Sequence, residues 1–217
     1  MHTAVAGFLF ASLVYANPKI PPPTTDVPLA SAPGKQTTVF AGGCFWGVQS
    51  VFERVQGVLA TTAGYSGGSV QTATYEQVSS ETTGHAESVQ VVFDPSQITY
   101  GTLLRVFFSV AHDPTQLNRQ GPDVGTSYRS AIFYTNPEQK RLADAYIAQL
   151  DSAKVFSGPI VTQVVPLKAF YPAEKYHQDY AYYNPDNPYI EVCDRPKIAA
   201  LKDQFPNLFV DYRPRKK

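Results

Sequence analysis

The sequence is poor in cysteine and carries no net charge, and both features exclude classes of protein. Two cysteines among 217 residues rule out a disulfide-dense scaffold. No Cys-x-x-Cys pair occurs and the four histidines are scattered, so no metal site is expected. Lys+Arg and Asp+Glu balance at 18 each, which gives no reason to expect a nucleic-acid partner. Phosphate-binding and dinucleotide-binding fingerprints are also absent, and no bound cofactor is expected.

The N-terminus has the features of an exported chain. The apolar run Ala4–Val14 is much shorter than the roughly 20 residues of a membrane-spanning helix, so no stable membrane insertion is expected. Val14-Tyr15-Ala16 fits a small-residue cleavage site, and residues 1–16 are predicted to be a signal peptide. We therefore expect the chain to be exported to a periplasm or to the medium. The segment before the run has no Lys or Arg, so a cytoplasmic location stays as the alternative.

A proline-rich stretch separates this segment from the body of the chain. Residues 17–36 include Pro21-Pro22-Pro23 and are predicted to be an extended linker. Residues 37–217 are predicted to form one catalytic domain, and we expect a monomer. The expected strands are Thr37–Ala41, Val58–Ala63, Glu87–Phe93, Tyr128–Tyr134 and Ile160–Val165. Helical patterns alternate with them, so we expect an α/β (α+β) two-layer sandwich with a mixed central sheet, flanking helices and an irregular C-terminal segment.

Cys44 lies where the first strand ends and a helix begins. A thiol at a helix N-terminus meets unpaired N–H groups and the positive end of the helix dipole, which favour the thiolate. Gly42 and Gly43 allow a sharp turn, and Phe45 and Trp46 can form an apolar wall beside the sulfur. The pattern indicates a nucleophile, although a lone buried cysteine can also serve only as a small apolar side chain.

Six blocks of the sequence resemble the A-type peptide methionine sulfoxide reductases. They occur in the order of that family, between about Thr37 and Phe209. The blocks are Gly43-Cys44-Phe45-Trp46-Gly47, Gly64-Tyr65-Ser66-Gly67-Gly68, Thr74-Tyr75-Glu76-Gln77-Val78, Thr83-Gly84-His85-Ala86-Glu87, His112-Asp113-Pro114-Thr115 with Gln120–Ile132, and Tyr176-His177-Gln178-Asp179-Tyr180. The resemblance implies reduction of methionine-S-sulfoxide, peptide-bound or free, in the repair of oxidised proteins.

The resemblance also implies roles for single residues. Cys44 would attack the sulfoxide sulfur, and Glu87 would supply the proton that the departing oxygen needs. A carboxyl among Val89, Val91 and Phe93 resists ionisation, which fits this role. Two phenols, Tyr75 and Tyr128, would hydrogen-bond the sulfoxide oxygen, and Asp123 would join this network. Pro122, just before it, stands where the family more often has Asn.

The remaining positions of the expected site are supporting ones. Phe45 and Trp46 would hold the S-methyl group of the substrate, since that group needs only an apolar wall. Gly43 and Gly47 would shape the turn, and His177 would brace the site without acting as a base.

Cys193 is the expected resolving cysteine. Reduction leaves a sulfenic acid on Cys44, and a second thiol condenses with it. Cys193 is the other cysteine of the chain, and the resemblance implies resolving cysteines in this region. A thioredoxin or another external dithiol would then reduce the Cys44–Cys193 disulfide. The alternation of Tyr189, Glu191 and Cys193 also permits an inert cysteine on a strand.

Two rival functions remain open at this point. A papain-like cysteine hydrolase would pair Cys44 with His177, which follows 133 positions later, but Trp46 lies one place too far from the cysteine for that motif. An exported binding domain stapled by a Cys44–Cys193 disulfide would never cycle between thiols and disulfide.

Overall fold

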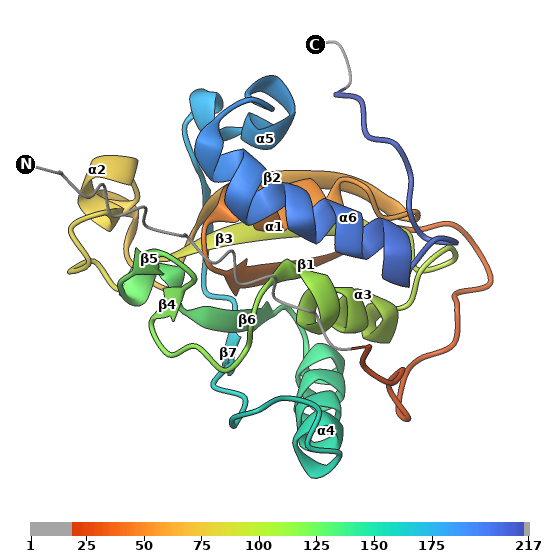
Figure 1. Ribbon diagram of the computed structural model, residues 1–217. Coiled ribbons are helices and arrows are strands. Elements are labelled where there is room, and N and C mark those ends of the chain that lie inside the picture. Colours follow the sequence, from red (N-terminus) through yellow and green to blue (C-terminus); the bar gives the residue numbers. More distant parts are fainter. Residues whose placement is uncertain (1–18, 215–217) are drawn as a thin grey trace, which may run out of the picture.

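The computed structural model describes residues 19–214, and its centre is a curled six-stranded sheet (Figure 1). The strand order is β7-β6-β1-β3-β2-β8, and every neighbouring pair is antiparallel except β6 and β7. The strands are β1 (Gln36–Gly42), β2 (Val58–Ser66), β3 (Ala86–Phe93), β6 (Ser130–Tyr134), β7 (Gln163–Pro166) and β8 (Phe170–Pro172). A small hairpin of β4 (Arg119–Gln120) and β5 (Asp123–Val124) lies apart from the sheet.

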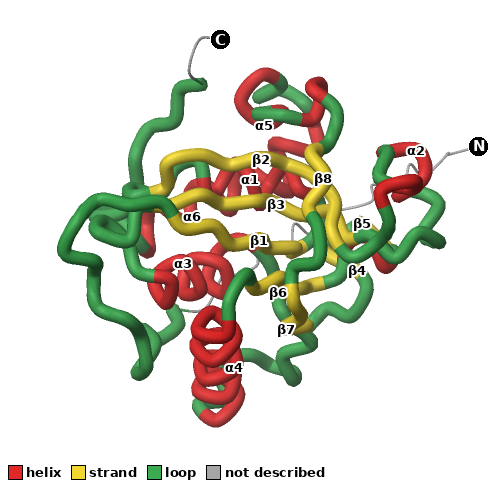
Figure 2. Tube along the Cα trace, turned by 180° about the vertical axis from the view of Figure 1, so that it is seen from behind, coloured by secondary structure: helices red, strands yellow, loops and turns green. Residues whose placement is uncertain are grey.

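The α-helices are α1 (Phe45–Phe52), α2 (Tyr75–Val78), α3 (Tyr100–Val106), α4 (Pro137–Ser152), α5 (Tyr180–Tyr183) and α6 (Arg195–Gln204). Of these, α1 packs on β2 and β3, α4 packs on β6 and β7, and α6 packs on α1. Phe40 of β1 stacks on Phe52 of α1 and on Phe107, with ring centroids 5.1 and 4.7 Å apart. From behind, the strands lie in front of α1 and α6 (Figure 2). The mixed sheet with flanking helices confirms the predicted two-layer α/β architecture.

Local sequence signals account for several helix starts. The Thr99 hydroxyl accepts a hydrogen bond from the Thr102 N–H (3.1 Å) and so caps α3. Asn136 caps α4 in the same way through the Gln139 N–H (2.9 Å), and Pro137 occupies the first helical position. Since β6 and β7 are parallel, the chain needs the long connection that α4 provides.

The proline-rich segment packs against the domain. Ile20 is buried, and its carbonyl accepts a hydrogen bond from Arg105 Nε (3.1 Å). The Tyr146 hydroxyl donates to the Pro21 carbonyl (2.6 Å), and Asp26 accepts from the Gly101 N–H at the start of α3 (3.0 Å). Residues 19–35 are therefore held on the catalytic body. The predicted signal peptide lies outside the described residues.

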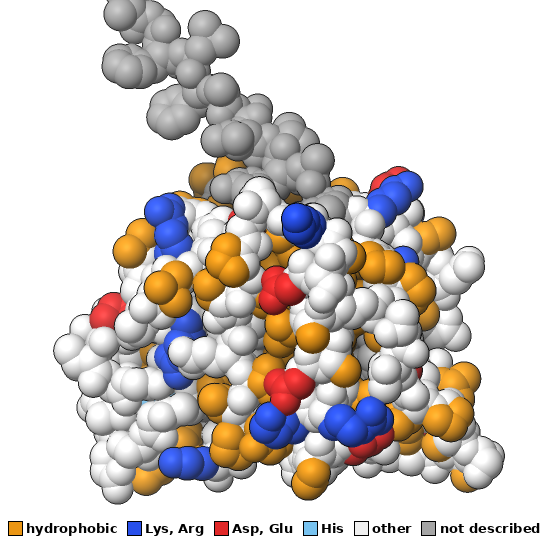
Figure 3. Space-filling model, turned by 90° about the horizontal axis from the view of Figure 1, so that it is seen from below, with side chains coloured by type: hydrophobic (Ala, Val, Ile, Leu, Met, Phe, Trp, Pro, Cys, Tyr) orange, Lys and Arg blue, Asp and Glu red, His pale blue; other side chains and the backbone are white. Residues whose placement is uncertain are grey.

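The face of the molecule on the α4 side shows mixed charge. In the view from the α4 side, basic, acidic and apolar side chains are interspersed and no broad area carries one sign (Figure 3). Two ion pairs of α4, Lys140–Asp144 and Arg141–Glu138, are solvent-exposed and contribute little to stability. Between residues 19 and 214, none of the helices has the length and apolar character required to span a bilayer.

Candidate active site

Cys44 immediately precedes α1, at the point where β1 has ended. Gly43 has φ +87°, a conformation open to glycine, and an added Cβ there would lie 2.5 Å from the Gln120 side chain. Cys44 is 7% exposed, and the Trp46 N–H favours the charged form of its thiol. The cysteine therefore occupies the helix N-terminus that the sequence indicated.

The protonation of Cys44 differs from the expectation based on helix position alone. Burial, and then the carboxyl groups of Glu87 and Asp194, raise its pKa well above the ordinary value for cysteine. The Trp46 N–H and the Lys197 ammonium act in the opposite direction but do not outweigh them. Cys44 is therefore a neutral thiol, because burial destabilises the thiolate more than the helix N-terminus stabilises it.

Glu87 lies on β3, with its carboxyl group facing the start of α1. Its Oε2 atom accepts a hydrogen bond from the Phe45 N–H (2.9 Å), and the residue is 4% exposed. Burial is the main cause that raises its pKa, to about 8, against the lowering effect of the Phe45 N–H. Asp123 and Glu81 add to the rise. The carboxyl group thus retains its proton at neutral pH, in agreement with the sequence-based expectation.

Tyr75 and Tyr128 approach the cysteine from two further elements. Tyr75 begins α2, and its N–H donates to Glu174 Oε1 (2.9 Å). Tyr128 ends a 3₁₀ turn, Thr126–Tyr128, and lies just before β6 and not within it as predicted. Burial, followed by the charge of Glu87, raises the pKa of both phenols, so each remains a hydrogen-bond donor. Both also interact electrostatically with Cys44.

Aromatic rings form one wall of the site. Trp46 stacks on Tyr180 with ring centroids 3.8 Å apart and meets Tyr189 edge-on at 5.9 Å. The Tyr189 hydroxyl in turn donates a short hydrogen bond of 2.5 Å to Asp123 Oδ2. Phe45 is fully buried and underlies this wall. Trp46 is only partly buried, so it is the more accessible ring of the two.

His177 braces the aromatic residues. Its Nδ1 atom accepts a hydrogen bond from Trp46 Nε1 (3.1 Å), and its ring lies 5.0 Å from Phe45 and 4.5 Å from Tyr75. Its pKa is lowered by burial, so the neutral form is favoured. The histidine thus contacts the rings of Trp46, Phe45 and Tyr75, and it makes no hydrogen bond to Cys44.

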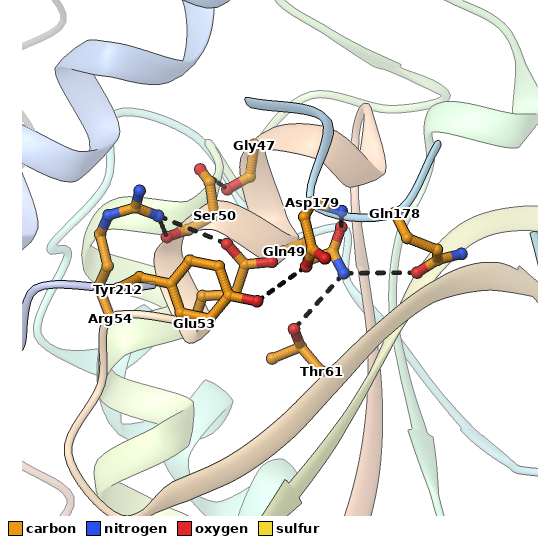
Figure 4. Close-up of polar contacts among 9 residues, drawn as sticks. All are labelled: Gly47, Gln49, Ser50, Glu53, Arg54, Thr61, Gln178, Asp179 and Tyr212. Carbon is orange, nitrogen blue, oxygen red and sulfur yellow. Dashed lines mark hydrogen bonds and ion pairs between the residues drawn. The ribbon is translucent and has the colours of Figure 1, made fainter. Parts of the chain in front are cut away.

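The residues after His177 fasten this wall to α1 (Figure 4). Gln49 Oε1 accepts a hydrogen bond from the Asp179 N–H (3.0 Å), and Asp179 Oδ1 accepts from the Tyr212 hydroxyl (2.9 Å). Gln178 bonds the backbone N–H and carbonyl of Ala63, both at 2.9 Å. One motif thus connects the catalytic helix, β2 and the C-terminal tail.

Cys193 lies in a π-helical turn, Ile190–Asp194, directly before α6. The strand considered as the inert alternative is therefore wrong, because Pro188-Tyr189 opens a helical segment. Cys193 is partly buried and, like Cys44, has a free thiol. Burial and then Asp194 raise its pKa, whereas Lys197 lowers it.

Gly47 explains how α6 approaches the catalytic helix so closely. A Cβ atom at this position would lie 2.1 Å from Asp194 Oδ1 and 2.5 Å from Lys197 Nζ. These two groups form an ion pair of 3.1 Å, and Asp194 is fully buried. The glycine is required because charged groups from α6 contact the first turn of α1.

The sequence did not single out several residues of the site. They include Glu81, Glu174, Tyr189, Asp194 and Lys197. Glu81 has φ 62° and accepts hydrogen bonds from the Ser127 N–H (2.8 Å) and the Ser127 hydroxyl (2.6 Å), which fixes the turn that carries Tyr128. No periodicity marks such contacts, since each joins segments far apart in the chain. Within residues 19–214, no group of three or more His, Cys, Asp and Glu side chains is arranged to hold a metal ion.

Comparison with known proteins identifies the relatives of this chain. The profile of the family described as peptide methionine sulfoxide reductase matches residues 36–208. The chain is 58% identical to peptide methionine sulfoxide reductase MsrA 2 of Mesorhizobium japonicum over 179 residues, 82% of this chain and 92% of that protein. The Synechocystis protein of the same name is 50% identical over 204 residues, 93% of this chain and 94% of its own.

Solved structures agree with the sequence relatives. Methionine sulfoxide reductase A of Corynebacterium diphtheriae superposes with a TM-score of 0.61 at 36% identity, covering 77% of this chain and 85% of that one. Reduced Mxr1 from Saccharomyces cerevisiae gives a TM-score of 0.64 at 32% identity, with 76% and 92% coverage.

Proposed function

This chain belongs to the peptide methionine sulfoxide reductase family, and from that premise we propose how its residues reduce methionine-S-sulfoxide. The enzyme is an oxidoreductase that returns oxidised methionine, peptide-bound or free, to methionine in protein repair. One observation carries the assignment of its chemistry. The protonated carboxyl group of Glu87 accepts a hydrogen bond from the first residue of the helix that follows Cys44.

The first step is a transfer of the oxidation state from substrate sulfur to Cys44. The sulfur of Cys44 attacks the sulfoxide sulfur while Glu87 donates its proton to the oxygen, and the vacated carboxylate takes up the thiol proton. The S–O bond breaks, and the oxygen leaves as water after it receives the second proton through Glu87. A water molecule then attacks the Cys44 sulfur, the new S–S bond breaks to release the thioether, and one proton returns to Glu87. One thiol and one sulfoxide thus give one sulfenic acid and one thioether. The Cys44 thiol and the Glu87 carboxyl group are both neutral before the reaction, because burial of the site disfavours a negative charge on either of them.

Tyr75 and Tyr128 stabilise the oxygen during this step. Their hydroxyls remain protonated, so they donate hydrogen bonds without competing for the proton of Glu87. Trp46 receives the S-methyl group, and its orientation is set by His177 and Tyr180. Asp123 holds Tyr189 against the edge of the same indole.

The second step regenerates Cys44 through Cys193. The Cys193 thiol attacks the sulfenic sulfur, the S–O bond breaks, and water leaves as the disulfide forms. Both cysteines interact with the same two charged groups, Asp194 and Lys197, which supports their proximity. A thioredoxin-like dithiol then reduces the disulfide, and its own two thiols become a disulfide.

The rival functions find less support. A papain-like hydrolase needs a Cys–His pair, but His177 Nδ1 bonds Trp46 and the acid beside Cys44 is Glu87. A binding domain with a permanent Cys44–Cys193 disulfide would not need a protonated carboxyl group beside Cys44. The matches to peptide methionine sulfoxide reductases favour neither rival.

Export accounts for the N-terminal apolar run, and we include it in the proposal. An oxidising compartment would require a dedicated electron donor for the Cys44–Cys193 disulfide. N-terminal sequencing of the protein from fractionated cells tests this part. A start at Asn17 in the exported fraction supports it, and an intact Met1 in the cytosol contradicts it.

Turnover of separated sulfoxide epimers tests the function. A synthetic peptide carrying methionine-S-sulfoxide should be reduced in the presence of thioredoxin, and the R epimer should not. Intact mass measurement after substrate without reductant should show loss of two hydrogens, and digestion should join the Cys44 and Cys193 peptides. Equal reduction of both epimers, or an oxidised enzyme without that cross-link, would contradict the proposal.

A further inference from the structure

The buried ion pair Asp194–Lys197 has no role in the reaction as described so far. It lies against the first turn of α1, with Asp194 Oδ1 and Lys197 Nζ 3.1 Å apart. Asp194 is completely buried, and the Lys197 side chain is 15% exposed. A buried ion pair seldom gains stability over apolar packing of the same volume, so its presence beside a reactive thiol needs another explanation.

The pair contacts the segments that carry the two cysteines. Asp194 follows Cys193 directly in the π-helical turn, and Lys197 is one turn further, in α6. On the other side the pair touches Gly47, three positions after Cys44, so closely that only a glycine fits. The pair thus joins the segment of the resolving cysteine to the helix of the nucleophile.

The pair is also asymmetric in its bonding. Lys197 donates a hydrogen bond to Oδ1 of Asp194, whereas Oδ2 has no hydrogen-bond partner among the described residues. An ammonium has three N–H donors, of which this bond uses one. The lysine can therefore pair with Asp194 and still donate a hydrogen bond to a neighbouring anion.

From this arrangement we propose that Lys197 is a shared positioning residue, which stabilises negative charge on Cys44 during reduction and on Cys193 during regeneration. The proposal rests on the roles given above to the two cysteines. Each sulfur gives up its proton at a different step, and one cation close to both segments can stabilise the charge that develops on each. Asp194 holds the ammonium at that point, and Gly47 leaves the space for it.

The electrostatics of the site agree with this role. Burial opposes the charge on Lys197, but Asp194 and then Cys44 outweigh it and raise the pKa of the lysine, so it stays charged. The other titratable groups that face Cys44 are Glu87 on β3, Asp194, and the phenols Tyr75, Tyr128 and Tyr189. All of these are neutral or negative. Lys197 is the positive side chain that acts on both thiols, and on each of them it opposes Asp194, whose effect is the larger.

Thiol titration tests the proposal without any sulfoxide. In Cys193→Ser protein, the rate of Cys44 alkylation by iodoacetamide is measured against pH, and in Cys44→Ser protein the same is done for Cys193. Lys197→Met should move both midpoints upward by about one pH unit, the shift expected for loss of a nearby charge in a partly buried site. Lys202→Met is the matched control, because Lys202 is an exposed lysine of the same helix, and it should move neither.

Two results would overturn the proposal. One is a Lys197→Met midpoint for Cys44 equal to that of Lys202→Met, and the other is a shift confined to one of the two cysteines. If Lys197→Met does not fold, Asp194→Asn is compared with Asp194→Asn/Lys197→Met, which contains no buried carboxylate without a partner. Because alkylation needs no reductase activity, a missing shift counts against Lys197 alone. Failure of the wild type to reduce sulfoxide counts against the proposed function.

Discussion

Replacement of Glu87 by glutamine should raise stability while it abolishes most of the activity. The amide oxygen of glutamine can still accept the 2.9 Å hydrogen bond from the Phe45 N–H, so the start of α1 should keep its geometry. The amide cannot release a proton. A general acid contributes about 10² to 10⁴ in rate, and the single-turnover reduction of sulfoxide should fall by that factor.

The stability gain follows from the pKa of Glu87. The folded carboxyl keeps its proton up to a pKa of about 8, whereas the unfolded one releases it near the ordinary glutamate pKa of 4.5. Between these values the wild type loses stability as the pH rises, because the unfolded state binds fewer protons. At pH 7 the loss amounts to roughly 3 kcal/mol, and the neutral glutamine does not incur it.

The assay is urea unfolding of wild type and Glu87→Gln at pH 5 and pH 7, with single-turnover kinetics on the same samples. The difference in unfolding free energy should be large at pH 7 and small at pH 5. The reasoning is refuted if the variant is no more stable than wild type at pH 7. It is also refuted if the variant reduces sulfoxide at a rate close to that of wild type.

Three further substitutions have defined outcomes. Cys193→Ser should complete about one turnover and then stall with thioredoxin, while small thiols restore cycling; sustained thioredoxin-driven turnover would contradict the resolving role. Gly47→Ala should lower the free energy of unfolding by about 1–3 kcal/mol, since its methyl overlaps Asp194 and Lys197; an unchanged urea midpoint would contradict that packing. Tyr128→Phe should slow single turnover by up to about 10²-fold without a change in urea midpoint, as expected for one lost donor to the sulfoxide oxygen, and an unchanged rate would remove Tyr128 from the oxygen site.

The sequence allowed the elements to be placed because their signals are local. Asn136 and Pro137 mark the start of α4, and Gly43 marks the turn before Cys44. The position of Tyr128 was less accurate, since its turn is held by Glu81, which is 47 positions earlier in the chain. Local pattern carries no information about such a contact.

The protonation state of Cys44 could not be predicted from its position in the sequence either. The helix N-terminus favours a thiolate at Cys44, but Glu87 and Asp194 are brought beside it by β3 and by the turn before α6. Their effect depends on distance in the folded state and not on spacing in the chain. The contacts of Ile20 and Asp26 with α3, which hold the proline-rich segment on the domain, also have no local signature in the sequence.

The most direct test of the central claim is to locate the oxidised sulfur after one turnover. Cys193→Ser protein is mixed with one equivalent of methionine-S-sulfoxide peptide and a sulfenic acid trap, and both products are quantified by mass spectrometry. One methionine and one trapped sulfenic acid on Cys44 should form per enzyme, and Cys44→Ser/Cys193→Ser should form neither. Methionine produced at an undiminished rate by the double variant would contradict the account.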